Sequence, residues 1–389
     1  MAKHTNNDTS CAQAPRATHC RAALCALATT ALLAACGGGG GGGQQTSTPV
    51  TSAATTSPTS PVVVNNYELQ TTVPAPTYAA GSWQEFVFNY INERRSQCGF
   101  GKLAQDTSLD KAAQGHAEYL ARLVADVGAS AYGLAMHEQV AGLPMFTGKT
   151  LYDRIVASGY SGTSIYSDES LAGGKTRSDP GARMDYVRER TQALLSTAYH
   201  MFMMMNQTRD IGLGMKNYSL AENPNNDYRD EILVVLSGWK AYRQASKTDV
   251  LTYPCEGSKD VSEALYGELP DPSAGQGFSL PSGPAILMTP PLNGELKVQN
   301  ASVTPISRLD GTPTTNIASF NYGAIYPSGI LILDQYTDTY NKVIRNSEGL
   351  FLLTHKPLEK GTKYRVVISF ALNGVPMQRS FDFSTRAVQ

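Results

Sequence analysis

Apolar residues recur at helical spacing in several segments of the first half of the chain. One amphipathic segment follows a Ser-x-x-Glu capping pattern at Ser82 and ends near Gly99. A second, at about residues 108–124, carries apolar side chains along one side. Two further helices are predicted at about residues 150–158 and 186–205, and Gly159 stands where a helix C-cap is expected.

Two strand patterns follow these helices. Residues 210–216 read Asp-Ile-Gly-Leu-Gly-Met-Lys, and residues 231–238 are apolar and β-branched, as a buried strand should be. A polar Asn/Asp/Pro-rich turn at residues 222–230 separates them. A block of helices followed by neighbouring strands indicates an α+β fold.

From residue 284 onward the pattern changes to short apolar runs divided by turn residues. Asn373-Gly374 is a strong hairpin signal, and it joins a run at residues 364–372 to a partner at residues 377–384. About seven short strands in about 105 residues are typical of a β-sandwich. The other runs are residues 285–288, 318–322, 329–333 and 350–353.

The N-terminal segment has the layout of a secretory signal. Residues 1–35 carry three basic residues and one acid, and they end in an Ala/Leu-rich run that is too short to span a bilayer. The closing Leu33-Ala34-Ala35-Cys36 resembles the bacterial lipobox, which implies lipid on Cys36 as the first mature residue. Gly37, in place of Asp, implies the outer membrane. The alternative is a plain signal peptide with an incidental cysteine.

Composition sets the domain organisation. We predict a signal peptide at 1–35, a lipidated Gly/Thr/Ser/Pro tether at 36–81, an α+β domain at 82–256, a linker at 257–283 and an all-β domain at 284–389. Removal of residues 1–35 leaves 29 basic and 32 acidic residues, so nothing indicates a nucleic-acid partner. The expected contact with a membrane is through the lipid.

Two cysteines remain in the mature chain beyond the lipidated one. Cys98 and Cys255 form an even pair in an oxidising compartment, which predicts one disulfide that closes a long loop. The alternative is two separate buried thiols.

The 82–255 region resembles the bacterial branch of the CAP superfamily, named for cysteine-rich secretory proteins, antigen 5 and pathogenesis-related protein 1. The family's sequence features occur here in order. The resemblance implies an α/β/α sandwich around a small antiparallel sheet. The matching residues are Asn92 and Arg95, Leu103, Asp106, Leu109 and Ala112-Ala113, His137-Glu138, Phe146-Thr147-Gly148 with Arg154 and Gly159-Tyr160, Glu169, His200, and Ile211-Gly212-Leu213-Gly214.

The chain also departs from this family pattern. Ser170 replaces the usual Asn after the first acid, and the family's second acid has no clear counterpart. Glu189 is the nearest candidate, but on one continuous helix it would lie about 16 Å from His200. The C-terminal part resembles the small Ig-like modules of bacterial surface proteins, with Gly361, Gly374 and the ending Phe381-Asp-Phe-Ser-Thr as supporting residues.

The resemblance brings His137, Glu169 and His200 to one cleft as candidate ligand-binding and metal residues. Two imidazoles and a carboxylate suit zinc, and the same groups can polarise a water. For each histidine alone, a structural imidazole is the alternative. The chain lacks a Gly-x-Ser-x-Gly motif, and its glycine run lacks the Lys of a phosphate-binding loop.

These features favour a non-enzymatic, envelope-anchored lipoprotein that binds an extracytoplasmic glycan, lipid or protein. A metal-dependent hydrolase acting from the same cleft is the alternative. A purely structural spacer is a third class, and it predicts no ligand.

The lipobox generates the first prediction. Cys36→Ala removes the acylated sulfur, so we expect the variant to leave the detergent phase in which the wild-type protein partitions, because the acyl chains provide the anchor. Detergent phase separation followed by immunoblotting measures this. Equal partitioning of the two proteins would show that the anchor is wrongly assigned.

Overall fold

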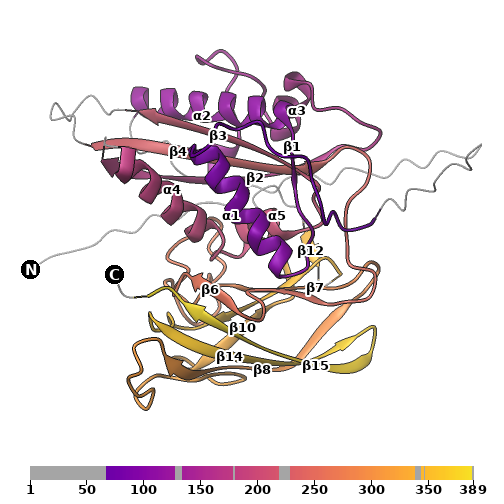
Figure 1. Cartoon of the computed structure of the whole chain (residues 1–389), viewed down its shortest axis with the longest axis vertical. Helices are drawn as coiled ribbons and strands as arrows, with labels where there is room; N and C mark the ends of the chain where they lie inside the picture. The colour runs from indigo at the N-terminus through magenta and orange to yellow at the C-terminus, as the bar shows by residue number, and fades with distance from the viewer. Residues whose placement is uncertain are drawn as a thin grey trace, which may run out of the picture. The chain divides into compact units, whose positions relative to one another are not determined.

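The computed structural model describes residues 67–127, 134–177, 180–218, 228–337, 343–345 and 347–387. The predicted signal peptide, Cys36 and the tether up to residue 66 lie outside the described residues, as does most of the turn predicted at 222–230. Helices and sheets are both present, which confirms a mixed α+β protein (Figure 1).

Local sequence signals set the ends of the helices. Ser82 Oγ accepts the Glu85 N–H at the start of the first helix, and a full capping box between Thr150 and Asp153 starts a later one. Gly159, with a φ of 100°, ends that later helix as predicted. The helices are α1 (Trp83–Gln97), α2 (Thr107–Val127), the 3₁₀ turn η2 (Leu134–His137), α3 (Leu151–Ser158), α4 (Pro180–Leu194) and α5 (Tyr199–Met205).

The helix predicted at 186–205 is broken into α4 and α5, which is a correction. The hydroxyls of Ser196 and Thr197 turn back to the carbonyls of Ala193 and Leu194, so they compete with the helical ladder. The N–H groups of residues 198–200 bond to the carboxylate of Glu268 and not to carbonyls one turn earlier. The backbone N–H groups at the break are therefore satisfied by a residue outside the helix.

A small sheet forms the centre of the N-terminal half. In the described part of the chain its strand order is β1-β3-β4-β2, with β2 and β3 antiparallel to β4 and β1 parallel to β3. Helices α2 and α3 cover one face, and α1, α4 and α5 lie on the other (Figure 1). The strands are β1 (Ala104–Gln105), β2 (Tyr166–Arg177), β3 (Asp210–Tyr218) and β4 (Tyr228–Trp239).

Strand β2 was not predicted, and the candidate residue Glu169 lies within it. The predicted strands at 210–216 and 231–238 are confirmed as β3 and β4. Gly212 and Gly214 on β3 lie directly against the backbone of α2, and a Cβ at either position would collide with that backbone. Glycine is therefore needed for α2 to pack closely on the sheet.

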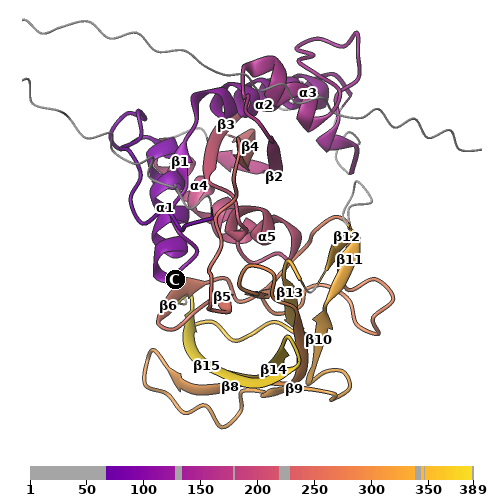
Figure 2. The ribbon, with the colours of Figure 1, turned by 90° about the vertical axis from the view of Figure 1, so that its right-hand side faces the viewer.

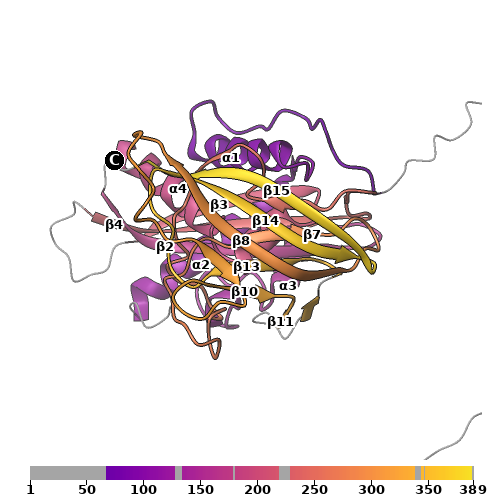
Figure 3. The same cartoon turned by 90° about the horizontal axis from the view of Figure 1, so that it is seen from below.

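The C-terminal strands form one curled sheet around their own apolar core (Figures 2 and 3). In the described residues its order is β5-β7-β13-β10-β9-β8-β14-β15-β6, so a single nine-stranded sheet stands where two separate sheets were expected. The Asn373-Gly374 hairpin is confirmed, because both residues have positive φ and Leu372 pairs with Val375.

The bounds of these strands agree with most of the predicted runs, and the long β8 was missed. The strands are β5 (Leu251–Tyr253), β6 (Ser258–Val261), β7 (Ile286–Thr289), β8 (Leu296–Arg308), β9 (Phe320–Tyr322), β10 (Gly329–Leu333), β13 (Leu350–Thr354), β14 (Thr362–Leu372) and β15 (Val375–Thr385). A separate pair is formed by β11 (Gln335–Thr337) and β12 (Val343–Arg345).

The segment predicted as a linker is part of the folded structure. Within residues 257–283, β6 pairs with β15, and Leu265 pairs with Ser282 and is fully buried. Strand β5, which lies inside the predicted 82–256 domain, pairs with β7 of the curled sheet. The curled sheet therefore includes strands from before its predicted boundary.

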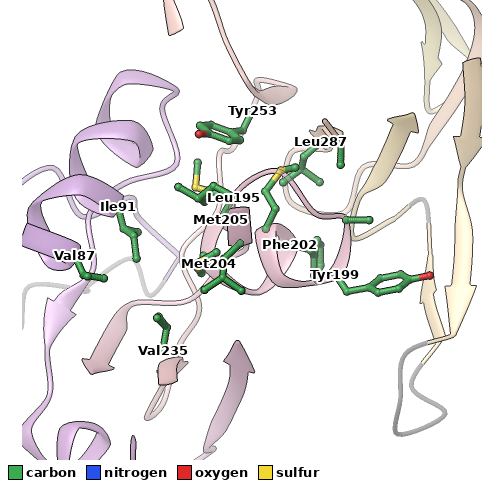
Figure 4. Close-up of a cluster of buried hydrophobic side chains, with 14 of the residues drawn as sticks. Val87, Ile91, Leu195, Tyr199, Phe202, Met204, Met205, Val235, Tyr253 and Leu287 are labelled. Carbon is green, nitrogen blue, oxygen red and sulfur yellow. The ribbon is translucent and has the colours of Figure 1, made fainter. Parts of the chain in front are cut away.

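One apolar core also joins the two halves. Val87 and Ile91 of α1, Phe202 and Met205 of α5, and Leu287 of β7 belong to a single buried cluster (Figure 4). The Phe202 and Phe351 rings meet edge to face at 6.3 Å between centroids. All described residues accordingly belong to one compact unit.

Residues 67–81, predicted to be the end of the tether, are also ordered against the fold. The side-chain amide of Gln70 donates to the carbonyls of Lys102 and Arg209, and the Gln70 N–H donates to Gln244. Within the described residues no helix is long and apolar enough to cross a membrane.

The predicted disulfide is confirmed. Cys98 and Cys255, 157 positions apart, are bonded with a Cα–Cα distance of 5.5 Å, and both are buried. Cys98 follows α1 and Cys255 precedes β6, so the bond ties the first helix to the segment that enters the curled sheet.

Reduction of this disulfide should therefore destabilise both halves together. The chain-entropy model gives a loss of up to about 5 kcal/mol for a loop of this length. Urea unfolding of the wild type and the Cys98→Ser/Cys255→Ser double variant, followed by tryptophan fluorescence, measures the difference. Unchanged stability, or alkylation of both cysteines in the folded oxidised protein, would contradict the expected role.

Candidate functional site

Glu169 lies at the centre of a buried polar cluster on the face of the small sheet that α2 and α3 cover. Its Oε1 accepts from Arg154 Nη2 at 2.6 Å, and its Oε2 lies 2.9 Å from His137 Nδ1. His116 Nε2 approaches the same Oε2 at 3.5 Å. Strand β2, α3, η2 and α2 thus each supply one group, and the side chain of Glu169 is only 2% exposed.

Charge compensation keeps Glu169 ionised in this buried position. Burial by itself raises the pKa of the Glu169 carboxyl, but the Arg154 guanidinium and the hydrogen bond to His137 hold that pKa well below its usual range. Arg154 Nη1 also donates to the His137 carbonyl at 3.1 Å. One arginine therefore fixes both the carboxylate and the backbone of the histidine beside it.

His116 also belongs to this cluster, although it was not among the predicted site residues. Its Nδ1 lies 3.0 Å from the Gln139 amide nitrogen and its Nε2 lies 2.9 Å from the Met136 carbonyl. These partners assign the proton to Nε2. Burial lowers the pKa of the His116 imidazole to about 4, so the ring is neutral at physiological pH.

His200 has a different acidic partner from the one predicted. Its Nδ1 lies 2.8 Å from Glu268 Oε1, and the Glu268 carboxylate also accepts from the N–H groups of residues 198–200 at 2.8 to 3.0 Å. Glu268 is fully buried at its side chain. Sequence reasoning missed it because it lies in the presumed linker, and no local spacing to His200 marks it.

Both histidines line one cavity of about 500 Å³ at the β2 edge of the small sheet. His137 comes from the α2/α3 side and His200 from the α5 side, while Leu171, Ala172 and Gly173 of β2 form the wall between them. The remaining lining is mostly apolar, with two acids at the loop after β6. Those residues are Met136, Ile232, Gly267, Glu268, Leu269, Asp271 and Leu280.

The predicted metal set of His137, Glu169 and His200 is not assembled. Both oxygens of Glu169 are engaged by Arg154, His137 and His116, so this carboxylate supports the imidazole from behind and does not face the cavity as a ligand. Within the described residues no group of three His, Cys, Asp or Glu side chains lies close enough to hold a metal ion. Two imidazoles alone fall short of the three or four protein ligands that zinc usually takes.

Glu189, the nearest sequence candidate for a second acid, also lies elsewhere. It lines a separate polar cavity with Arg188, Asp260 and Arg386. Although the helix breaks between Glu189 and His200, the break does not bring them together.

Comparisons with known proteins give no family. No family model matches the chain, and no curated protein matches it. Among solved structures, the C-terminal domain of the AgI/II polypeptide BspA of Streptococcus agalactiae is 10% identical, over 58% of this chain and 89% of that chain, with a TM-score of 0.11. A likeness at that score carries no argument about fold or function.

The neutral state of His116 predicts a pH dependence of stability. Its pKa of about 4 in the fold lies below the ordinary value of about 6.5 in the unfolded chain, so the unfolded state binds the proton first as pH falls. The stabilisation from the neutral ring is complete above pH ~6.5 and is lost as pH falls through ~4, with a total of about 3 kcal/mol.

Urea unfolding at pH 7.5, 6, 5 and 4 measures this dependence. We expect the wild type to lose stability over that range more steeply than His116→Gln, which retains a donor for the Met136 carbonyl but does not titrate. Parallel pH profiles for the two proteins would show that His116 is not the group responsible.

Proposed function

We propose that this protein is an envelope-anchored binding lipoprotein whose extracytoplasmic ligand occupies the cavity between His137 and His200. The observation that carries the proposal is the cavity itself. It combines a mostly apolar wall with two imidazoles, each held at Nδ1 by a buried carboxylate. An apolar pocket with a few fixed polar groups is the usual form of a ligand site.

The polar groups around the cavity are held rigidly. Glu169 is fixed by Arg154, and Glu268 is fixed by three backbone N–H groups of α5. Each carboxylate in turn limits the rotation of its imidazole. A site that is ordered before binding loses less conformational entropy when the ligand arrives, so the arrangement supports binding.

Kinship with the CAP superfamily is part of this proposal. Helices on both faces of a small sheet, and two histidines at one cavity, support it. The Ig-like character of the C-terminal half and the outer-membrane anchor at Cys36 are proposed with it, on the sequence features alone.

A hydrolase acting from the same cavity is the second candidate. A carboxylate on Nδ1 orients an imidazole for general-base work and is the usual partner behind a metal-ligating histidine. Glu169 bonds to Arg154 and His137, so it is not free to serve as the third zinc ligand of a metal-dependent hydrolase. Binding is therefore the better-supported function.

Occupancy of the cavity can be tested with the neutral apolar dye N-phenyl-1-naphthylamine, whose fluorescence rises when water is excluded. Leu269→Asp places a charge at the cavity lining, so we expect dye affinity to fall at least about tenfold, because desolvation of the carboxylate opposes binding. Leu309→Asp is the matched control, since Leu309 is 56% exposed and Leu269 is 54% exposed.

Equal dye binding by the wild type and both variants would show that the cavity does not take an apolar ligand. Hydrolysis of ester or peptide substrates that is lost in His200→Ala, with the fold retained by circular dichroism, would favour the second candidate.

A further inference from the structure

The two edges of the small sheet differ in how their backbone groups are satisfied. The sheet order places β2 at one edge and β1 with β3 at the other (Figure 2). On the β3 side, the outward N–H groups of Leu213 and Met215 donate to the side chains of Asp110 and Gln114 on α2. That edge is therefore closed by α2 and β1.

The direction of the backbone groups on β2 follows from the strand register. The Ile211 carbonyl accepts from the Asp106 N–H, and Leu213 and Met215 donate to α2, so odd-numbered residues of β3 face away from β4 and even-numbered residues face it. Because Gly212 pairs with Leu236, even-numbered residues of β4 face β3 and odd-numbered residues face β2.

The same alternation continues across the next ladder. Ser170 pairs with Val235 and Ala172 with Leu233, so the even-numbered residues of β2 bond to β4. The N–H and C=O groups of Glu169, Leu171 and Gly173 point outward from the sheet. Within the described residues these outward groups have no hydrogen-bond partner.

This open edge coincides with the cavity. Leu171 and Gly173 line it, with the His137 side chain from one layer and the His200 side chain from the other. Four outward backbone groups on these two β2 residues therefore border an apolar space of about 500 Å³.

We propose that the ligand of this cavity is an extended peptide segment of a partner protein, which adds as a further strand along residues 169–173 of β2. The proposal rests on the function proposed above and names its ligand class. Backbone hydrogen bonds to an open sheet edge supply affinity, and the pockets beside it select alternate side chains. At about 3.3 Å per residue, a segment of about five residues spans this stretch.

The chemistry of the cavity also specifies the segment. Met136, Ile232 and Leu280 favour apolar side chains at every second position. The acids Glu268 and Asp271 line the cavity, and no Lys or Arg of the described part of the chain does. A basic residue in the segment is therefore favoured over an acidic one.

We assign the occupant to a separate protein. The described chain begins near the β1 edge of the sheet, where the carbonyl of Glu68 accepts from Arg209 and Gln70 bonds to the carbonyl of Lys102. A synthetic peptide of residues 44–66 serves as the test of this point.

The experiment uses the full mature chain and a hexapeptide library with acetylated and amidated ends. The best binder is then N-methylated at one residue at a time, and affinities are measured by fluorescence anisotropy. Methylation of residues whose N–H faces β2 should lower affinity about tenfold or more, because each methyl group replaces a donor to β2 and keeps the two strands apart. Methylation of the alternating residues should change it less than about threefold.

Leu269→Asp should lower affinity for the same peptide, and Leu309→Asp should not, which places the peptide in the cavity. The proposal is overturned by an N-methyl profile without the period of two, by binding that Leu269→Asp leaves unchanged, or by preferred binding of the 44–66 peptide. If no peptide binds while the dye still does, this inference fails and the proposed function stands. If neither binds, both fail.

Discussion

The buried ion pair between Glu169 and Arg154 is the interaction on which the site and much of its surrounding fold depend. Both side chains are almost fully buried, and neither can lose the other without leaving an uncompensated charge, which typically costs about 3–5 kcal/mol. Beside this pair, His137 bonds to the same carboxylate and the neutral His116 ring lies 3.5 Å from it. Strand β2 is thereby tied to α3, to η2 and to α2, and a change at Glu169 alters the fold and the cavity together.

Glu268 plays the corresponding part on the other face of the sheet. It belongs to the segment after β6, yet it caps α5 and holds His200, so the segment that enters the curled sheet completes the cavity of the other half. The Ala285 N–H donates to the Ser196 carbonyl at the break between α4 and α5, which reinforces the same junction. The shared apolar core and the Cys98–Cys255 bond also join the two halves. The segment between β6 and β7 is thus a structural component of the site.

Helix ends and tight turns could be predicted from the sequence, because they are determined by local interactions. The Ser82 cap, the Gly159 terminus and the Asn373-Gly374 hairpin depend on a few adjacent residues, and the structure confirms each of them. Strand β2 was missed because its sequence, Tyr-Ser-Asp-Glu-Ser-Leu-Ala-Gly-Gly-Lys-Thr-Arg, is polar and Gly-containing and lacks the apolar pattern of a strand. Its pairing along the full length of β4 supplies the stability that its composition does not.

The acidic partners of the two histidines likewise depend on contacts that are distant in the sequence. Glu169 was placed at the cleft through a resemblance to a family pattern, whereas its bond to Arg154 requires the approach of α3 to β2. Glu268 is 68 positions from His200 and lies in a stretch rich in Pro, Gly and Ser, where composition indicates a linker. Long-range contacts of this kind depend on the tertiary fold, and no single-sequence pattern encodes them.

An open sheet edge normally invites aggregation, and proteins usually cover or pair such edges. Here the protein covers the β3 edge with β1 and with side chains from α2, while the amides of Leu171 and Gly173 remain without protein partners within the described residues. The edge is bordered by His137 on one side and by His200 on the other, so it lies inside a cavity and not on a flat surface. Side chains on both sides of the edge oppose the approach of a second sheet. The same geometry that limits edge-to-edge association therefore makes the edge suitable for a single strand.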